Sequence, residues 1–231
     1  MKEMSATHKA AKAGIATEVK ITVGHFGLTG DLIVPADARG VVLFAHGSGS
    51  SRNSPRNQFV ARVLRQAGVG TLLFDLLTPR EELLDVQTAE LRFDICLLAH
   101  RLKAATSWVM NDPRTNEMPI GYFGASTGGA AALVAAAELG DHVKAVVARG
   151  ARSDMAGSAL PLVTAPTLLI VGELDRPVIS MNRASLDQLR CEKRLEIVSG
   201  ATHLFEEPGT LEEVSLLAAG WFAKHFSNRE K

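Results

Sequence analysis

The sequence has few cysteines and no cluster of residues typical of a metal site. Its 231 residues include two cysteines, Cys96 and Cys191, which lie far apart and match neither metal nor redox spacing. A disulfide framework requires several cysteines at short intervals in a small secreted chain. No group of His, Cys, Asp and Glu residues has the spacing of metal ligands either. We therefore expect no disulfide framework, no metal and no other cofactor.

Long apolar runs are also missing. No stretch approaches the roughly 18 consecutive apolar residues that a membrane-spanning helix needs. Residues 1–14 lack the apolar core of a signal peptide. We expect a cytoplasmic protein that does not associate with membranes, with residues 1–15 as a flexible tail.

The chain has no excess of charge of either sign. Lys and Arg together number 25, as do Asp and Glu, and no basic tract is present. This balance argues against a general nucleic-acid-binding protein. The length and the 46% of hydrophobic residues favour one domain with a sizeable core, which we place at residues 16–231.

The apolar residues that are present form short continuous runs, which are typical of strands buried on both faces of a sheet. The expected strands are 41–45, 70–74, 120–123, 143–148, 166–171 and 194–198, after a hairpin of 18–23 and 26–34. The expected helices are 55–66, 88–110, 127–139, 181–189 and 211–226, with a loop at 76–85 and a loop containing a short helix at 149–164. Alternating strands and helices predict an α/β fold, a mostly parallel sheet with helices on both faces.

A Gly-x-Ser-x-Gly motif, residues 124–128, lies between the strand at 120–123 and the helix at 127–139. This is the pattern of a nucleophile elbow, in which strand and helix pass so closely that only small residues fit beside the serine. The alternative is a glycine-rich turn that leaves Ser126 solvated. Residues elsewhere in the chain distinguish a nucleophile elbow from a solvated turn.

Polar residues follow the other predicted strands as well. Functional groups gather at the carboxyl ends of parallel strands, and His46, Asp75, Ser126, Asp175 and His203 all follow strands. The order Ser126, Asp175, His203 is that of the catalytic triad in α/β-hydrolases. It predicts Ser126 as nucleophile, His203 as general base and Asp175 as the carboxylate that orients the imidazole.

Other residues compete for these roles. His203 is alternatively an ordinary loop histidine. Glu173 and Asp154 are rivals of Asp175, which we favour because it precedes a turn into a helix. Gly47 and Gly49, followed by Asp75, match part of a dinucleotide-binding motif. Its third glycine position holds Arg52, however, which argues against nucleotide binding.

The transition state of acyl transfer needs hydrogen-bond donors for the developing oxyanion. We expect them to be the backbone N–H groups of Thr127, directly after the nucleophile, and of Ser48, in the loop after the strand at 41–45. Gly47 and Gly49 permit the tight course of that loop, and His46 then has a structural role. The alternative is a flexible Gly/Ser turn.

Four segments carry a resemblance to a known family: FAHGSGSSRNSPRN (44–57), GYFGASTGG (121–129), TLLIVGELDRPV (167–178) and GATHLFEEPG (200–209). The chain resembles the α/β-hydrolase superfamily, and within it the dienelactone hydrolase-like proteins, including a bacterial subgroup also found fused to phosphoribosyltransferase domains. The resemblance implies about eight strands and ester hydrolysis, and the short segments at 76–87 and 149–165 predict a minimal lid. Dienelactone hydrolases carry a cysteine nucleophile where this chain has Ser126, which argues against dienelactone as the substrate.

Arginines near the expected site are candidate ligands for an anionic group of the substrate, since a guanidinium binds a carboxylate through two hydrogen bonds. They are Arg52, Arg149 and Arg152. The alternative is that they are solvated or paired with nearby glutamates.

Together these features predict a serine hydrolase that cleaves small soluble carboxylic esters through an acyl-enzyme, as a monomer or homodimer. A binding protein without turnover, and an acyltransferase or perhydrolase with the same triad, remain as alternatives.

Overall fold

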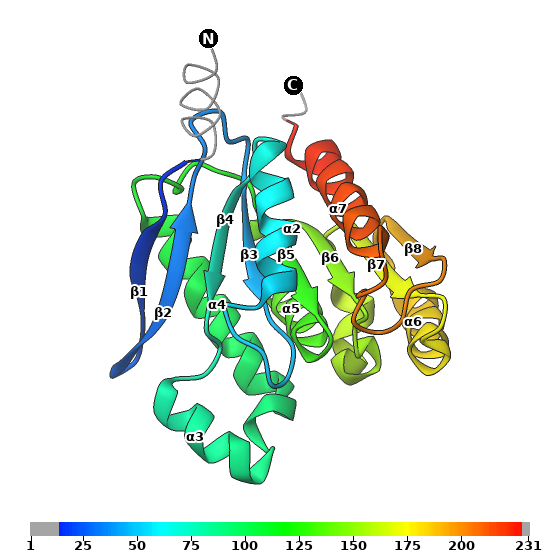
Figure 1. Cartoon of the computed structure of the whole chain (residues 1–231). Helices are drawn as coiled ribbons and strands as arrows, with labels where there is room; N and C mark the ends of the chain where they lie inside the picture. Colours follow the sequence, from blue (N-terminus) through cyan, green and yellow to red (C-terminus); the bar gives the residue numbers. More distant parts are fainter. Residues whose placement is uncertain (1–13, 228–231) are drawn as a thin grey trace.

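The computed structural model describes residues 14–227, so the predicted tail lies almost wholly outside the described residues. Its centre is an eight-stranded sheet in the order β1-β2-β4-β3-β5-β6-β7-β8 (Figure 1). The strands are β1 (Thr17–Val23), β2 (Phe26–Ile33), β3 (Val41–Ala45), β4 (Gly70–Phe74), β5 (Ile120–Ala125), β6 (Val143–Arg149), β7 (Thr167–Gly172) and β8 (Lys193–Val198). The hairpin β1–β2 is antiparallel and joins β4 antiparallel, and all other pairs are parallel. The predicted fold class is confirmed.

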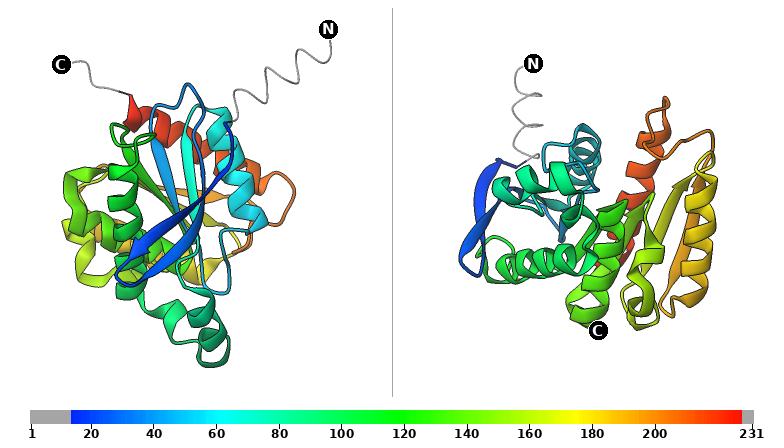
Figure 2. Two further views of the ribbon diagram at one scale, coloured as in Figure 1. Left: turned by 90° about the vertical axis from the view of Figure 1, so that its left-hand side faces the viewer. Right: turned by 90° about the horizontal axis from the view of Figure 1, so that it is seen from below.

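Helices cover both faces of the sheet (Figure 2). The α-helices are α2 (Pro55–Gln66), α3 (Pro79–Thr88), α4 (Ile95–Asn111), α5 (Thr127–Leu139), α6 (Arg176–Gln188) and α7 (Thr210–Phe226). The 3₁₀ segments are η1 (Leu91–Phe93), η2 (Gly140–His142) and η3 (Ser153–Leu162). Apolar residues of α2 and α7 form one core with one face of the sheet, and those of α4, α5 and η3 form a second core on the opposite face. Every residue of β3, β4, β5 and β7 is buried, as expected for strands covered on both sides.

One predicted loop and one predicted helix were wrong. Residues 79–88 form α3, which projects from the body (Figure 1). The Thr78 side chain accepts from the Glu81 backbone while the Glu81 side chain accepts from Thr78, a capping box that fixes the start of the helix. Ala89, at φ 56°, ends it. The single helix expected at 88–110 therefore begins only at Ile95, because α3 and η1 precede it.

The helix after β7 also begins earlier than predicted. It starts at Arg176, with Pro177 in its first turn, and not at Met181. Proline is well accommodated there because the first N–H groups of a helix have no partner within it. Asp175 therefore lies at the junction of β7 and α6, over the carboxyl edge of the sheet.

Candidate active site

Ser126 lies in a sharp turn between β5 and α5. Its backbone is left-handed, with φ 51° and ψ −119°, a strained conformation for a residue with a side chain. The Ser126 N–H donates to the Arg149 carbonyl at 3.1 Å, and the Ser126 carbonyl accepts from Gly129 and Arg152. A Cβ added to Gly124 would lie 2.6 Å from the Gly128 carbonyl oxygen. Strand and helix are therefore in the close contact that an elbow requires.

Gly128 is the most crowded position of this turn, and we expect Gly128→Ala to destabilise the protein by about 3 kcal/mol or more. Its added Cβ would lie 2.1 Å from the Ala45 carbonyl oxygen, so β3 or α5 would have to move. Gly220→Ala in α7 is the matched control, because no atom lies within 4 Å of its added Cβ and alanine favours helix by about 1 kcal/mol. Urea unfolding of both variants measures the difference. Equal stabilities would contradict the crowding.

His203 and Asp175 form a hydrogen-bonded pair. His203 Nδ1 lies 2.6 Å from Asp175 Oδ2, and the side chains are 39% and 13% exposed. Donation from Nδ1 to the carboxylate leaves Nε2 of a neutral imidazole as an acceptor. The ring lies against Gly150, whose added Cβ would be 3.3 Å from His203 Cε1.

The segment at 149–150 connects this pair with Ser126. The Arg149 carbonyl holds the Ser126 N–H, and Gly150 contacts the His203 ring. The Ser126 hydroxyl has no hydrogen-bond partner within residues 14–227. The hydrogen bond between a nucleophile and its general base is often long in the absence of substrate and shortens in the substrate complex. The three predicted residues thus converge on one edge of the sheet.

The rival carboxylates have other partners. Glu173 accepts from Gly200 N–H at 2.8 Å and from the Ser199 hydroxyl at 2.9 Å, and these bonds lower the pKa of Glu173. Asp154 binds the Arg152 guanidinium through both carboxylate oxygens. Glu173 therefore supports the loop that carries His203, and Asp154 is engaged in an exposed ion pair.

The predicted oxyanion donors lie at one small cleft. Ser48 and Thr127 both line it, together with His46, Leu76 and Leu98 among others. Thr127 is the first residue of α5, where backbone N–H groups have no partner within the helix. A Cβ added to Gly47 would lie 3.1 Å from Ser126 Cβ, so the loop after β3 passes directly beside the serine.

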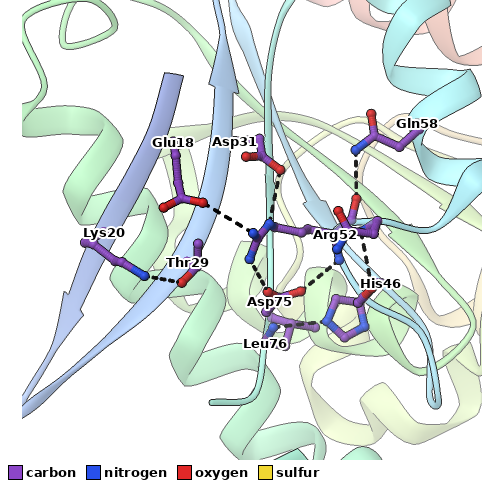
Figure 3. Close-up of polar contacts among 11 residues, drawn as sticks. Glu18, Lys20, Thr29, Asp31, His46, Arg52, Gln58, Asp75 and Leu76 are labelled. Carbon is purple, nitrogen blue, oxygen red and sulfur yellow. Dashed lines mark hydrogen bonds and ion pairs between the residues drawn. The ribbon is translucent and has the colours of Figure 1, made fainter. Parts of the chain in front are cut away.

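His46 fixes the course of that loop, as predicted. Its Nε2 accepts from the Leu76 N–H at 3.0 Å, and Nδ1 is 3.0 Å from the Gly47 carbonyl oxygen (Figure 3). One ring nitrogen therefore donates and the other accepts, which requires neutral imidazole. Burial of the ring lowers the pKa of His46, more than the hydrogen bond to Gly47 and the charge of Asp75 raise it.

We expect the unfolding free energy to fall in acid because the buried His46 resists protonation. Because its folded pKa lies below its unfolded value, the unfolded chain binds more protons, and stability is lost as pH falls below about 6.5. His46→Gln keeps an acceptor but does not titrate. We expect the unfolding free energy of the wild type to decline more steeply than that of His46→Gln between about pH 6.5 and about pH 5 in urea titrations. Parallel declines would exclude His46 as the source.

Two arginines predicted to bind substrate are engaged by carboxylates. Arg52 forms ion pairs with Asp75 at 2.7 Å, with Asp31 at 3.1 Å and with Glu18 at 3.5 Å, and its backbone N–H donates to Asp75 (Figure 3). Arg152 is held by Asp154. Both guanidinium groups are thus paired with carboxylates, the alternative considered above, through partners distant in sequence for Arg52 and through a partner two residues away for Arg152. Arg52 instead ties the loop after β3 to the hairpin.

Arg92 and Asp85 at this cleft were not identified from the sequence. Asp85, almost fully buried, accepts from the Arg92 backbone N–H and Nε, while the Asp85 carbonyl accepts from Nη2. These bonds lower the pKa of Asp85 against the effect of its burial. The remaining Nη1 is 4.0 Å from a Cβ added to Gly49. Arg92 was assigned to a long helix, and no local motif marks it.

Within residues 14–227 no group of three His, Cys, Asp or Glu side chains is arranged to hold a metal ion. None of the helices in that range is both long and apolar enough to cross a bilayer.

Comparison with known proteins places the chain in a family. The dienelactone hydrolase family profile matches residues 61–219. A solved dienelactone hydrolase from Anabaena variabilis ATCC 29413 is 58% identical, with a TM-score of 0.91 over 92% of this chain and 99% of that one. A lidless α/β serine hydrolase from Xanthomonas campestris, 19% identical, has a TM-score of 0.72 over 90% and 94% of the two chains and shows the fold alone.

A curated relative from Mycobacterium tuberculosis (strain H37Rv), provisionally named a phosphoribosyl transferase, is 53% identical over 208 residues. The match covers 90% of this chain and 46% of that protein, so the chain spans about half the length of the curated relatives it matches. Their name fits the subgroup that occurs fused to phosphoribosyltransferase domains. By its family profile and its identity to a solved member, the chain belongs to the dienelactone hydrolase family.

Proposed function

We propose that the protein is a serine hydrolase that cleaves small carboxylic esters with Ser126, His203 and Asp175. The observation that carries the proposal is the convergence of the His203–Asp175 pair and the strained Ser126 turn on residues 149–150. A strained elbow is costly to maintain, and a histidine oriented by a carboxylate is suited to accept a proton from a nucleophile.

The reaction follows from the positions of these groups. Ser126 Oγ attacks the ester carbonyl carbon while His203 Nε2 takes its proton. The N–H groups of Thr127 and Ser48 stabilise the oxyanion. When the tetrahedral intermediate collapses, the bond between its carbon and the alcohol oxygen breaks. The alcohol takes the proton from His203 and departs, and the acyl group stays on Ser126. A water molecule that gives its proton to His203 then attacks the acyl carbon. The bond to Ser126 Oγ breaks, Oγ takes back the proton, and the carboxylic acid is released. Asp175 keeps the neutral imidazole in the Nδ1–H tautomer and stabilises the imidazolium that forms when Nε2 is protonated.

Labelling with a fluorophosphonate probe tests this proposal. The folded wild type should form a covalent adduct at Ser126, identified by peptide mass spectrometry, and His203→Ala should label far more slowly because the base is lost. Circular dichroism establishes that both proteins are folded. Absence of labelling in folded wild type would defeat the proposal.

We also propose that the anionic-substrate role expected of an arginine belongs to Arg92. It lines the cleft that carries Ser48 and Thr127, and its Nη1 is not used by Asp85. Arg92→Lys keeps a cation for the buried Asp85 but removes the planar fork. We expect KM for esters bearing a carboxylate to rise about tenfold relative to KM for neutral esters. An unchanged ratio in steady-state assays would refute the assignment.

A further inference from the structure

Arg149, the last residue of β6, is buried, and no carboxylate of residues 14–227 pairs with it. It is 8% exposed, and its Nε and Nη1 have no hydrogen-bond partner in this part of the chain. Burial, together with the charge of Arg56, lowers the pKa of Arg149 to about 10. An unpaired buried charge is destabilising unless another contact compensates for it. The contact that Arg149 does make therefore indicates why a guanidinium is retained here.

That contact is with Phe205. The Arg149 guanidinium carbon lies 5.5 Å from the centre of the Phe205 ring, within the range of a cation–π interaction. Phe205 is 2% exposed and has φ 54°, a conformation in which a bulky side chain is an outlier. It is two residues from His203, so Phe205 anchors the loop that carries the proposed base.

The same loop is held at other points by polar contacts. The Thr202 N–H donates to Glu207 at 3.1 Å, and Glu206 pairs with Arg56 at 3.0 Å. Glu206 is largely exposed, and exposed pairs contribute little. The buried Phe205–Arg149 contact is better placed to fix the His203 ring.

Arg149 also touches the other half of the site. Its carbonyl accepts from the Ser126 N–H, and the next residue, Gly150, lies against the His203 ring. One residue thus fixes Ser126 through its backbone and the His203 loop through its side chain.

We propose that Arg149 is a positioning residue that sets His203 over Ser126 through its contact with Phe205. The inference rests on the proposed function, because positioning matters only if His203 acts on Ser126. A direct role in binding anionic substrates is the competing explanation. It is disfavoured because Nε and Nη1 are closed off from solvent.

Arg149→Met tests the proposal, since it keeps much of the buried volume and removes the charge. We expect kcat for p-nitrophenyl esters to fall about tenfold to a hundredfold, with KM nearly constant, because small displacements of catalytic groups have effects of this size. Thermal stability should be unchanged or higher, since an unpaired buried charge is lost. Arg62→Met is the control, because it removes an Arg–Phe contact of the same kind, 4.9 Å from the Phe59 ring, on α2.

The results separate the alternatives. A rise in KM for acidic esters alone would indicate substrate binding and overturn the proposal. An unchanged kcat would overturn it as well. Phe205→Leu should reproduce the loss of kcat, and Arg149→Met/Phe205→Leu should be no worse than either single variant, because both act through one contact. If Arg149→Met does not fold, Phe205→Leu alone decides on the same criteria.

A readout without turnover keeps this inference apart from the proposed function. The proton between His203 Nδ1 and Asp175 should give a low-field resonance in the ¹H NMR spectrum of the wild type. We expect it to broaden or shift in Arg149→Met and to stay in place in Arg62→Met. An unchanged resonance would count against positioning even if the esterase assays fail. A changed resonance in a protein that fluorophosphonate does not label would refute only the hydrolase.

Discussion

Ser126→Ala should lower kcat for any accepted ester by about 10⁵- to 10⁶-fold, because the nucleophile and its covalent intermediate are lost. KM should change little, since the cleft and its N–H groups remain. Residual hydrolysis above the rate in water would come from oxyanion binding. Steady-state assays with p-nitrophenyl acetate measure the loss.

Ser126→Gly is the informative companion of that variant. Ser126 has φ 51°, and glycine accepts this conformation without strain. We expect Ser126→Gly to be as inactive as Ser126→Ala but more stable to unfolding by about 1 kcal/mol. Activity retained by either variant would mean that another group is the nucleophile.

The second large effect is expected at Asp175. Asp175→Asn replaces the acceptor of the His203 Nδ1–H by an amide that can donate, which favours the tautomer with the proton on Nε2. That tautomer cannot accept a proton from Ser126. We expect kcat to fall about 10⁴-fold, with the fold intact.

Asp187→Asn is the matched control for this loss. Asp187 is exposed on α6, the helix that Asp175 precedes, and undergoes the same change of charge. Its kcat should equal that of the wild type. If Asp175→Asn keeps wild-type kcat while Glu173→Gln loses it, Glu173 is the orienting carboxylate.

Much of the fold could be predicted because its central strands are marked in the sequence by short, continuous apolar runs. The run at 41–45 is apolar throughout and the run at 70–74 has Thr71 as its one polar residue, and both became strands with those bounds. Ser126 and Thr127 were placed correctly at the end of β5 and the start of α5, since Gly124 and Gly128 mark a turn that other residues cannot occupy.

What could not be predicted depends on solvent-facing apolar residues and on distant partners. In α3 the side chains of Leu83, Leu84 and Val86 are exposed, so their spacing gave no sign of a buried helical face. The ion pairs of Arg52 could not be foreseen because its partners are distant in sequence: Glu18 is 34 residues away, Asp75 is 23 and Asp31 is 21. Contacts across such separations follow from the topology of the sheet and leave no local signature.

The ion pairs of Arg52 have a consequence for how the protein folds. Docking of β2 on β4 brings Asp31 close to Asp75, two like charges whose repulsion opposes closure of that edge. Pairing of Arg52 with both carboxylates offsets their repulsion. It also docks the loop after β3, which carries Ser48, beside Ser126. Closure of the sheet edge and ordering of the loop that carries the proposed oxyanion donor Ser48 should therefore occur as one cooperative event, so that a chain with an open edge also lacks the complete proposed site.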